Sequence, residues 1–537
     1  MSKTTTEILI IGAGLSGAVT ALQLARSNIK VTCLEQGQWN NREDYPGDKP
    51  DFELLSMGPW HANPNVRKSP ADYSILDDTS DIKPMLYNGV GGSTILYSAH
   101  WMRFLPSDFN VHSLDGVGKN WPINYHDLAP HYNQNDIDFG VSGIAGDPAY
   151  PDFPEYPMPP LPIQPWGERV ANAHHKMGWH WWPGSNAIAS LPYKGRRPCV
   201  QRSTCRAGCN EGAKGSVDQT HWPEAIACGA ILKTGARVSR ILLDQHGLAC
   251  GALFKDASGN THKIESEIVI LASHAIGSAQ LLLKSTSPKF PNGLANHSDQ
   301  VGRNLMMHPL SRVIGFFDEP MMSWQGHWGQ SIYSLEFAET RPEHDFVRGA
   351  KWNLSPSGGP LSAALYPIDE SRCWGKPLHQ RIDNWLGRSA VWGITAEDLP
   401  NRQNRLVLDP NFIDSNGDPT VRLIYKVSEN SKRILKFMTA KAVQSFGEAG
   451  AHQTSASSLV TDNGWHALGT CRMGIDADQS VVNPWLQSHD VKNLYIVDGS
   501  VFVTSSSVNP AATIAALARR TAKYIIKSRS TIKRAKI

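Results

Sequence analysis

The feature that most constrains the fold is a glycine-rich turn near the N-terminus. An apolar run over residues 7–11 leads into Gly12, Gly14 and Gly17, which have the spacing GxGxxG. The pattern predicts a strand, a tight turn, a helix over residues 18–27 and a second strand that ends at Glu35. Such a βαβ unit begins a doubly wound, Rossmann-like α/β sheet.

Each of the three glycines and the acid in this unit has a physical task. Gly12 permits the tight turn, Gly14 lets a pyrophosphate approach the backbone, and Gly17 lets the helix pack on the strand. The helix N-terminus faces the phosphate charge, and the Glu35 carboxylate can accept hydrogen bonds from ribose hydroxyls. A lone GxGxxG is a weak signal, but here its strand–helix–strand–acid context is complete. The unit predicts a dinucleotide site without separating FAD from NAD.

The length of 537 residues, 41% of them hydrophobic, indicates two or three domain-sized cores. The sequence contains no run of 18 apolar residues, so it predicts no membrane-spanning helix. The first seven residues lack the basic region and cleavage site of a signal peptide, so we expect synthesis and folding in the cytoplasm. Export together with a signal-bearing partner stays open. Proline and aromatic residues crowd residues 140–183, which predicts an extended, irregular connection there.

The net charge of +3 is unevenly distributed. Residues 519–537 contain no acid, and their basic residues are Arg519, Arg520, Lys523, Lys527, Arg529, Lys533, Arg534 and Lys536. We expect a solvated tail after the last helix, with docking on an acidic partner or membrane surface as the alternative. Nucleic-acid binding is not expected without a wider basic face.

Four further segments carry a resemblance to a known family. They are NGVGGSTILYSAHWMRF from Asn88, VILASHAIGSAQLLLKS from Val269, VGRNLMMHP from Val301, and WHALGTCRMG from Trp465 with NLYIVDGS and SVNP after it. Together they resemble the glucose–methanol–choline (GMC) oxidoreductases, which are FAD-dependent, from residue 7 to about residue 525. The resemblance implies a discontinuous FAD-binding domain over residues 1–105, 195–310 and 460–537. Residues 106–194 and 311–459 would form an α+β substrate-binding cap.

The resemblance also assigns site residues. Alcohol oxidation needs a base for the hydroxyl proton, a group that holds the oxygen, and a hydride acceptor. In the family, the His at the position of His466 is the general base, and Asn509 matches the second member of a His–Asn pair. The cofactor contacts would be Gly12, Gly14, Gly17, Glu35, Gly91, Gly92, Ser93, Val238, Asp498, Gly499 and Pro510.

Both assigned site residues also have a structural interpretation. A single His in a glycine-rich loop is usually structural, and a flavoprotein without catalytic activity stays an alternative. Asn509 is also expected as the N-cap of a helix that opens at Pro510. The N-terminus of that helix is expected to face the flavin, where its positive dipole end would stabilise an anionic reduced ring.

Three cysteines form a cluster in the loop over residues 196–214. Cys199, Cys205 and Cys209 have the spacing C-x5-C-x3-C, and short cysteine spacings supply the thiolates of iron–sulfur centres. The loop resembles that of the catalytic subunits of bacterial FAD-dependent glucose, fructose and gluconate-type dehydrogenases, which implies a [3Fe–4S] cluster. A zinc site with His221 as fourth ligand and three unliganded thiols are the alternatives.

These features together predict an FAD-dependent dehydrogenase of a sugar or polyol. The resemblance further implies that its electrons pass through the cluster to a cytochrome c or another acceptor, and that a small subunit with an export signal carries the enzyme to the periplasm. The chain contains 17 tryptophans, and the faces of their rings can stack on sugars. The alternative is a cluster-free GMC oxidase or dehydrogenase of a steroid or other apolar alcohol, because the fold does not set the substrate.

Overall fold

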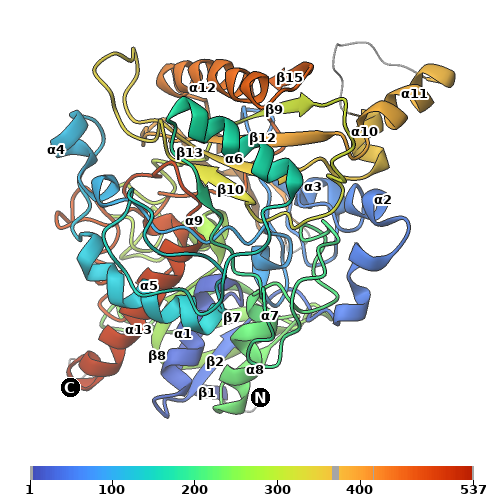
Figure 1. Ribbon diagram of the computed structural model, residues 1–537. Helices are drawn as coiled ribbons and strands as arrows, with labels where there is room; N and C mark the ends of the chain where they lie inside the picture. Colours follow the sequence, from blue (N-terminus) through green and yellow to red (C-terminus); the bar gives the residue numbers. More distant parts are fainter. Residues whose placement is uncertain (1–3, 366–373, 415–416, 535–537) are drawn as a thin grey trace.

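The computed structural model describes residues 4–365, 374–414 and 417–534, and its sheets are flanked by helices (Figure 1). Within this described part, no helix is both long and apolar enough to cross a membrane. The shorter helices are α2 Phe52–Ser56, α3 Pro64–Arg67, α4 Val111–Asp115, α7 Val217–Thr220, α8 Trp222–Ala227, α10 Pro360–Leu365 and α11 Lys376–Trp385.

The first sheet contains the predicted βαβ unit and has the strand order β5-β2-β1-β8-β7-β6, with β16 beside β8. Its strands are β1 Thr4–Ile11, β2 Val31–Leu34, β5 Ile231–Lys233, β6 Arg237–Leu243, β7 Ala249–Lys255, β8 Thr261–Leu271 and β16 Leu494–Ile496. β5, β2, β1, β8 and β16 run parallel, whereas β7 and β6 are antiparallel additions. The apolar run of β1 is almost fully buried, as parallel strands covered on both faces require. The Rossmann-like α/β prediction is confirmed.

Helices far apart in sequence cover this sheet. α1 Leu15–Ala25 packs against α13 Ala511–Arg534, and α13 also packs against α5 Tyr125–Phe139. α9 His274–Lys284 follows β8 directly. The strands of the sheet thus come from three separated stretches of the chain. The sheet is complete only when residues 494–534 pack against the N-terminal unit.

The second sheet is antiparallel, with the order β15-β9-β12-β11-β10-β4. Its strands are β4 Trp182–Pro183, β9 Leu310–Phe316, β10 Ile332–Ser334, β11 Ala350–Pro356, β12 Ser389–Ala396 and β15 Gln453–Ser457. α12 Glu429–Glu448 and α6 Pro165–Met177 pack on it at the top of Figure 1. α6 lies inside residues 140–183, so the prediction of an irregular connection is wrong for the residues of α6. Pro165 starts α6 at a position where a missing N–H costs nothing.

A small third sheet joins distant parts of the chain, because β3 Ile75–Leu76 pairs with β14 Pro419–Ile424, which pairs with β13 Arg405–Ile413. The boundaries between the FAD-binding and cap domains stay a prediction. The pairing does tie residues from the two predicted domains into one sheet.

The basic C-terminal stretch is not a solvated tail, and that prediction is wrong for its first residues. α13 continues to Arg534, and Arg519 is only 2% exposed. The Arg519 guanidinium pairs with Asp138 and donates to Asn135 Oδ1 at 2.6 Å, so it joins α13 to α5. Arg520 lies over the Trp485 ring and donates to the Pro484 carbonyl at 2.6 Å.

We predict that Asp138→Asn lowers the free energy of unfolding by about 3–5 kcal/mol, because it leaves the buried Arg519 charge uncompensated. The measurement is denaturant unfolding. Glu429→Gln is the control, since Glu429 pairs with Lys432 on the exposed surface of α12 and such pairs contribute little. Equal, small effects of both substitutions would contradict the proposed role of the buried pair.

Candidate active site

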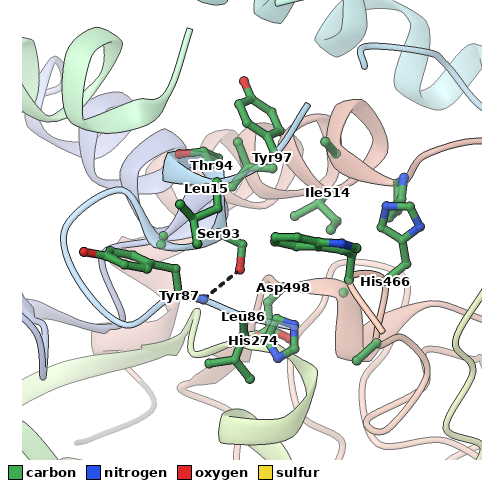
Figure 2. Close-up of a pocket in the computed structure, with 18 of the residues that line it drawn as sticks. Leu15, Leu86, Tyr87, Ser93, Thr94, Tyr97, His274, His466, Asp498 and Ile514 are labelled. Atoms are coloured by element: carbon green, nitrogen blue, oxygen red, sulfur yellow. Dashed lines mark hydrogen bonds between the residues drawn. The ribbon is translucent and has the colours of Figure 1, made fainter. Parts of the chain in front are cut away.

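One cavity of about 340 Å³ extends from the glycine-rich turn to the second sheet (Figure 2). It opens at the carboxyl ends of β1, β2 and β8, where doubly wound sheets bind ligands. The expected site residues that line it are Gly12, Gly14, Glu35, Gly92, Ser93, Val238, His466, Asp498, Gly499, Asn509 and Pro510. Gly17 and Gly91 lie outside the lining.

The three glycines of the turn differ in what surrounds them. A Cβ at Gly12, where φ is +104°, would lie 2.5 Å from the Ala272 carbonyl oxygen, and one at Gly17 would lie 2.0 Å from the Gly12 oxygen. A Cβ at Gly14 would meet nothing closer than Gly92 Cα at 3.8 Å. Gly12 and Gly17 therefore serve close packing, whereas Gly14 leaves space beside the cavity.

Glu35 lies at the end of β2 and is buried. Its Oε2 accepts a hydrogen bond from the Ala13 N–H at 2.8 Å, and its Oε1 accepts from the Gly37 N–H at 2.9 Å. Burial raises the pKa of this carboxyl, and the backbone N–H groups oppose that rise. The carboxylate lines the cavity beside the turn, so the two fit the ribose and phosphate of a dinucleotide.

The segment after Asn88 forms the opposite wall of the turn. The Gly91 N–H donates to the Ala13 carbonyl at 3.0 Å, and a Cβ at Gly92 would lie 2.8 Å from Gly14 Cα. Ser93 points into the cavity in Figure 2, and its Oγ accepts from the Tyr87 N–H at 3.4 Å. On the far side, Asp498 accepts hydrogen bonds from Ser278 and from the Ser500 N–H.

His466 lies at the other end of the cavity, and its neighbours decide which ring nitrogen carries the proton. His308 Nε2 lies 3.2 and 2.8 Å from the carbonyl oxygens of Ser505 and Ser506, which can only accept, so this nitrogen is protonated. His308 Nδ1 is then an acceptor, and it lies 2.8 Å from His466 Nδ1. His466 Nδ1 must therefore donate, which leaves a lone pair on His466 Nε2.

The lone pair on His466 Nε2 is available at neutral pH. Burial lowers the pKa of His466 well below its usual range, and His308, Lys351 and His100 lower it further. Burial likewise lowers the pKa of His308 to about 4. Both rings are neutral in the resting protein, so His466 can accept a proton from a group bound in the cavity.

Asn509 is directed at this histidine. Its Nδ2 lies 3.4 Å from His466 Nε2, while its Oδ1 accepts from Lys351 Nζ at 2.8 Å and lies 3.2 Å from His100 Nδ1. α13 begins at Ala511, and its first helical bond runs from the Ile514 N–H to the Pro510 carbonyl. The helix thus begins one residue later than predicted, with Pro510 and not Asn509 at the N-cap position, while the Asn509 side chain serves the cavity. Pro510, Ala511 and Ile514 bring the start of α13 to the cavity wall.

Three residues of this centre were not assigned from the sequence. His308 lies in the VGRNLMMHP segment, and His100 in the segment from Asn88, but neither pattern tells what its ring contacts. Lys351 has one local signal, a lone cation within the apolar strand β11. The contacts of all three cross more than 150 positions of the chain.

The three cysteines of the loop over residues 196–214 lie close enough to influence one another electrostatically, and all three pack against the main core. Burial, together with the neighbouring Cys205 and Cys209, raises the pKa of the Cys199 thiol to about 12. Lys214 Nζ donates to the carbonyls of Ile95, Tyr97 and Cys205 at 2.6, 3.1 and 2.5 Å. It thereby joins the loop to the segment that lines the cavity.

The zinc alternative fails on geometry. His221 packs its ring against Phe139 at 4.2 Å and faces Asp138, not the cysteines. Among the residues that the structure describes, no three His, Cys, Asp or Glu side chains are arranged to hold a single metal ion.

Comparison with known proteins gives consistent matches over the whole chain. Two family models described as GMC oxidoreductase match residues 175–310 and 393–518, and one described as NAD(P)-binding Rossmann-like domain matches residues 10–40. A 2-methyl-1,2-propanediol dehydrogenase of Mycolicibacterium austroafricanum is 38% identical over 98% of this chain and 96% of its own. The fructose dehydrogenase large subunit of Gluconobacter japonicus is 28% identical over 97% of each.

Solved structures match the fold at low sequence identity. A formate oxidase variant of Aspergillus oryzae has a TM-score of 0.65 at 15% identity, and the match covers 99% of this chain and 100% of that one. A pyridoxine 4-oxidase, from Mesorbium loti in its title, has a TM-score of 0.64 at 16% identity, with 97% and 99% covered.

We predict that Gly14→Ala folds normally but carries much less bound dinucleotide, because its methyl group enters the space beside the cavity without clashing with the protein. Gly17→Ala should instead lower the melting temperature, since its methyl group would overlap the Gly12 carbonyl. The measurements are thermal unfolding and the absorbance of dinucleotide released by denaturation. Full dinucleotide content in Gly14→Ala would place the phosphates elsewhere.

Proposed function

The chain belongs to the GMC oxidoreductase family, and from that premise we propose that it is an FAD-dependent dehydrogenase acting on an alcohol group of a sugar or polyol. The observation that carries the proposal is the hydrogen-bonded line from Ser506 through His308 to His466, with Asn509 beside it. This line ends in the same cavity that begins at the dinucleotide turn.

The residues of the chain divide the chemistry among them. When bound, FAD supplies the acceptor for the hydride that leaves the carbinol carbon. His466 Nε2 accepts the hydroxyl proton, because its lone pair is the one that His308 leaves free. Asn509 Nδ2 donates to the substrate oxygen as negative charge develops there. His308 and the two carbonyls behind it hold the imidazole in place while it becomes positively charged.

A polar substrate is favoured by the wall opposite the glycine turn. Asn353 and Ser355 of β11 and Thr395 of β12 line the cavity there, together with Trp328 and Trp465. Amides and hydroxyls can bond several hydroxyls of a polyol, and indole rings can stack on its C–H faces. Relatives named for a propanediol and for fructose support this class. A steroid would bury these polar groups without partners, at a cost in free energy.

The cysteine loop supports a route for the electrons. The Trp328 backbone N–H bonds the Cys205 thiol, and Trp328 itself lines the cavity, so the loop lies directly behind the wall. We propose that Cys199, Cys205 and Cys209 ligate a [3Fe–4S] cluster. Such a cluster would supply a one-electron centre between the flavin and an external acceptor.

The name of the fructose dehydrogenase large subunit indicates that this relative works in an assembly. By analogy we propose a small subunit and a cytochrome c acceptor as partners of this chain. A small subunit with an export signal would bring the complex to the periplasm. The competing function is a cluster-free oxidase that passes its electrons to oxygen.

We predict that His466→Ala slows the reduction of the bound flavin by an alcohol about 10²- to 10⁴-fold, because the base is lost. His308→Phe should also slow it strongly, since His466 then loses the partner that fixes its tautomer. Anaerobic stopped-flow absorbance measures both rates. His246→Ala, in the exposed turn between β6 and β7, is the control and should be unchanged. An undiminished rate in His466→Ala would exclude His466 as the base.

We predict that anaerobically purified protein contains about three iron atoms per chain together with flavin. Cys205→Ser should lose the iron but keep flavin reduction by substrate, because Cys205 does not itself line the cavity. Cys228→Ser is the control, since Cys228 is exposed and outside the loop. Iron analysis and the visible spectrum are the measurements. Flavin without iron under these conditions would favour the oxidase.

A further inference from the structure

A buried lysine lies behind the catalytic end of the cavity and has no part in the steps described above. Lys351 is in β11, where alternate residues face the same side of the sheet. Asn353 and Ser355 on that side line the cavity, while Trp352 and Leu354 enter the core on the other side. Lys351 is 0% exposed. An amine at such a position loses its hydration and is retained only where protein groups replace water.

Three neutral side chains replace that water. Lys351 Nζ lies 2.8 Å from Asn509 Oδ1, 3.2 Å from His100 Nδ1 and 3.3 Å from Asn353 Oδ1. Among the residues that the structure describes, no carboxylate forms an ion pair with it. Burial accordingly lowers the pKa of Lys351 well below its usual range. Ion pairing therefore does not explain why a lysine is kept at this buried position. Its hydrogen bonds to neutral groups must explain it.

The strongest of these contacts determines how the Asn509 carboxamide is oriented. A carboxamide presents an acceptor on one side and a donor on the other, and it can rotate by 180° to exchange them. Lys351 Nζ donates in either protonation state and lies 2.8 Å from Asn509 Oδ1, which can only accept. Nδ2 then faces His466 Nε2. In the rotated form, Oδ1 would oppose the His466 lone pair, and the lysine would lose its acceptor.

We propose that Lys351 is a positioning residue that keeps Asn509 Nδ2 directed at the substrate oxygen beside His466; this rests on the proposed alcohol oxidation. Lys351 does not itself line the cavity, whereas Asn509 and His100 do, so it acts through Asn509. His100 Nδ1 also lies 3.2 Å from the same Oδ1. The contact also joins β11 of the second sheet to the loop before α13, so donor orientation depends on correct docking of these two parts.

Substitution of Lys351 tests the proposal. Lys351→Met removes the donor at similar length, and flavin reduction by an alcohol should slow about ten- to a hundredfold, with little change in the substrate concentration for half-saturation. Lys351→Gln keeps a donor that can face Oδ1 and should recover part of the rate. Lys83→Met is the control, because Lys83 is a half-buried lysine that bonds Asp77 and does not line the cavity.

Two further readouts separate positioning from a general structural role. In an Asn509→Ala background, Lys351→Met should add no further loss, because its effect passes through Asn509. The pH at which flavin reduction falls on the acid side should also rise in Lys351→Met, through a direct charge effect on His466 that is separate from the positioning role, so the double variant is compared well above that pH. The groups that face His466 are His308, Lys351 and His100, and removing the lysine leaves His466 more easily protonated.

Additive losses in the double variant, or an unchanged rate in Lys351→Met, would overturn the proposal. If Lys351→Met does not fold, an activity of Lys351→Gln as low as that of Asn509→Ala would overturn it as well. The outcome is separable from that of the proposed function. A slow His466→Ala protein with a normal Lys351→Met protein refutes only the positioning role, whereas an undiminished His466→Ala protein refutes the base.

Discussion

The hydrogen bond between His308 Nδ1 and His466 Nδ1 is the contact on which the chemistry of the cavity depends. A neutral imidazole has one donor and one acceptor, and only its neighbours decide which nitrogen is which. Here the decision begins at the carbonyls of Ser505 and Ser506 and passes through His308, so that the free lone pair of His466 lies on Nε2. Within the part of the chain that the structure describes, no carboxylate hydrogen-bonds to either ring, and the pair stays neutral until a substrate proton arrives.

The carbonyls at the start of this line are themselves held by the surrounding structure. Ser506 has a φ of +59°, a left-handed conformation that a non-glycine residue adopts only when its contacts impose it. Its Oγ donates to Asp108 at 2.6 Å, and Asp108 pairs with the buried Arg348. Ser505 exchanges hydrogen bonds with the backbone of Asp398. The tautomer of His466 therefore depends on an ion pair and a strained turn that never touch the substrate.

The sequence predicted the parts of the protein that local rules determine. Gly12, Gly14, Gly17 and Glu35 lie within one βαβ unit, where spacing and strand–helix alternation carry the information. Resemblance added His466 and Asn509, and the structure brings them together in the cavity. The role of His308 was not predictable in this way, since its partner lies 158 positions away. The burial of Arg519 in the C-terminal basic stretch was not predictable either, because its partner Asp138 lies 381 positions away in the sequence.

Neutron diffraction from crystals of the flavin-loaded protein would test the central claim most directly, because it locates the hydrogen atoms. The account predicts a hydrogen on His308 Nε2 directed at the Ser506 carbonyl, a hydrogen on His466 Nδ1 directed at His308, and none on His466 Nε2. A hydrogen on His466 Nε2 in the substrate-free protein would contradict the account, since the nitrogen assigned to receive the hydroxyl proton would already be occupied.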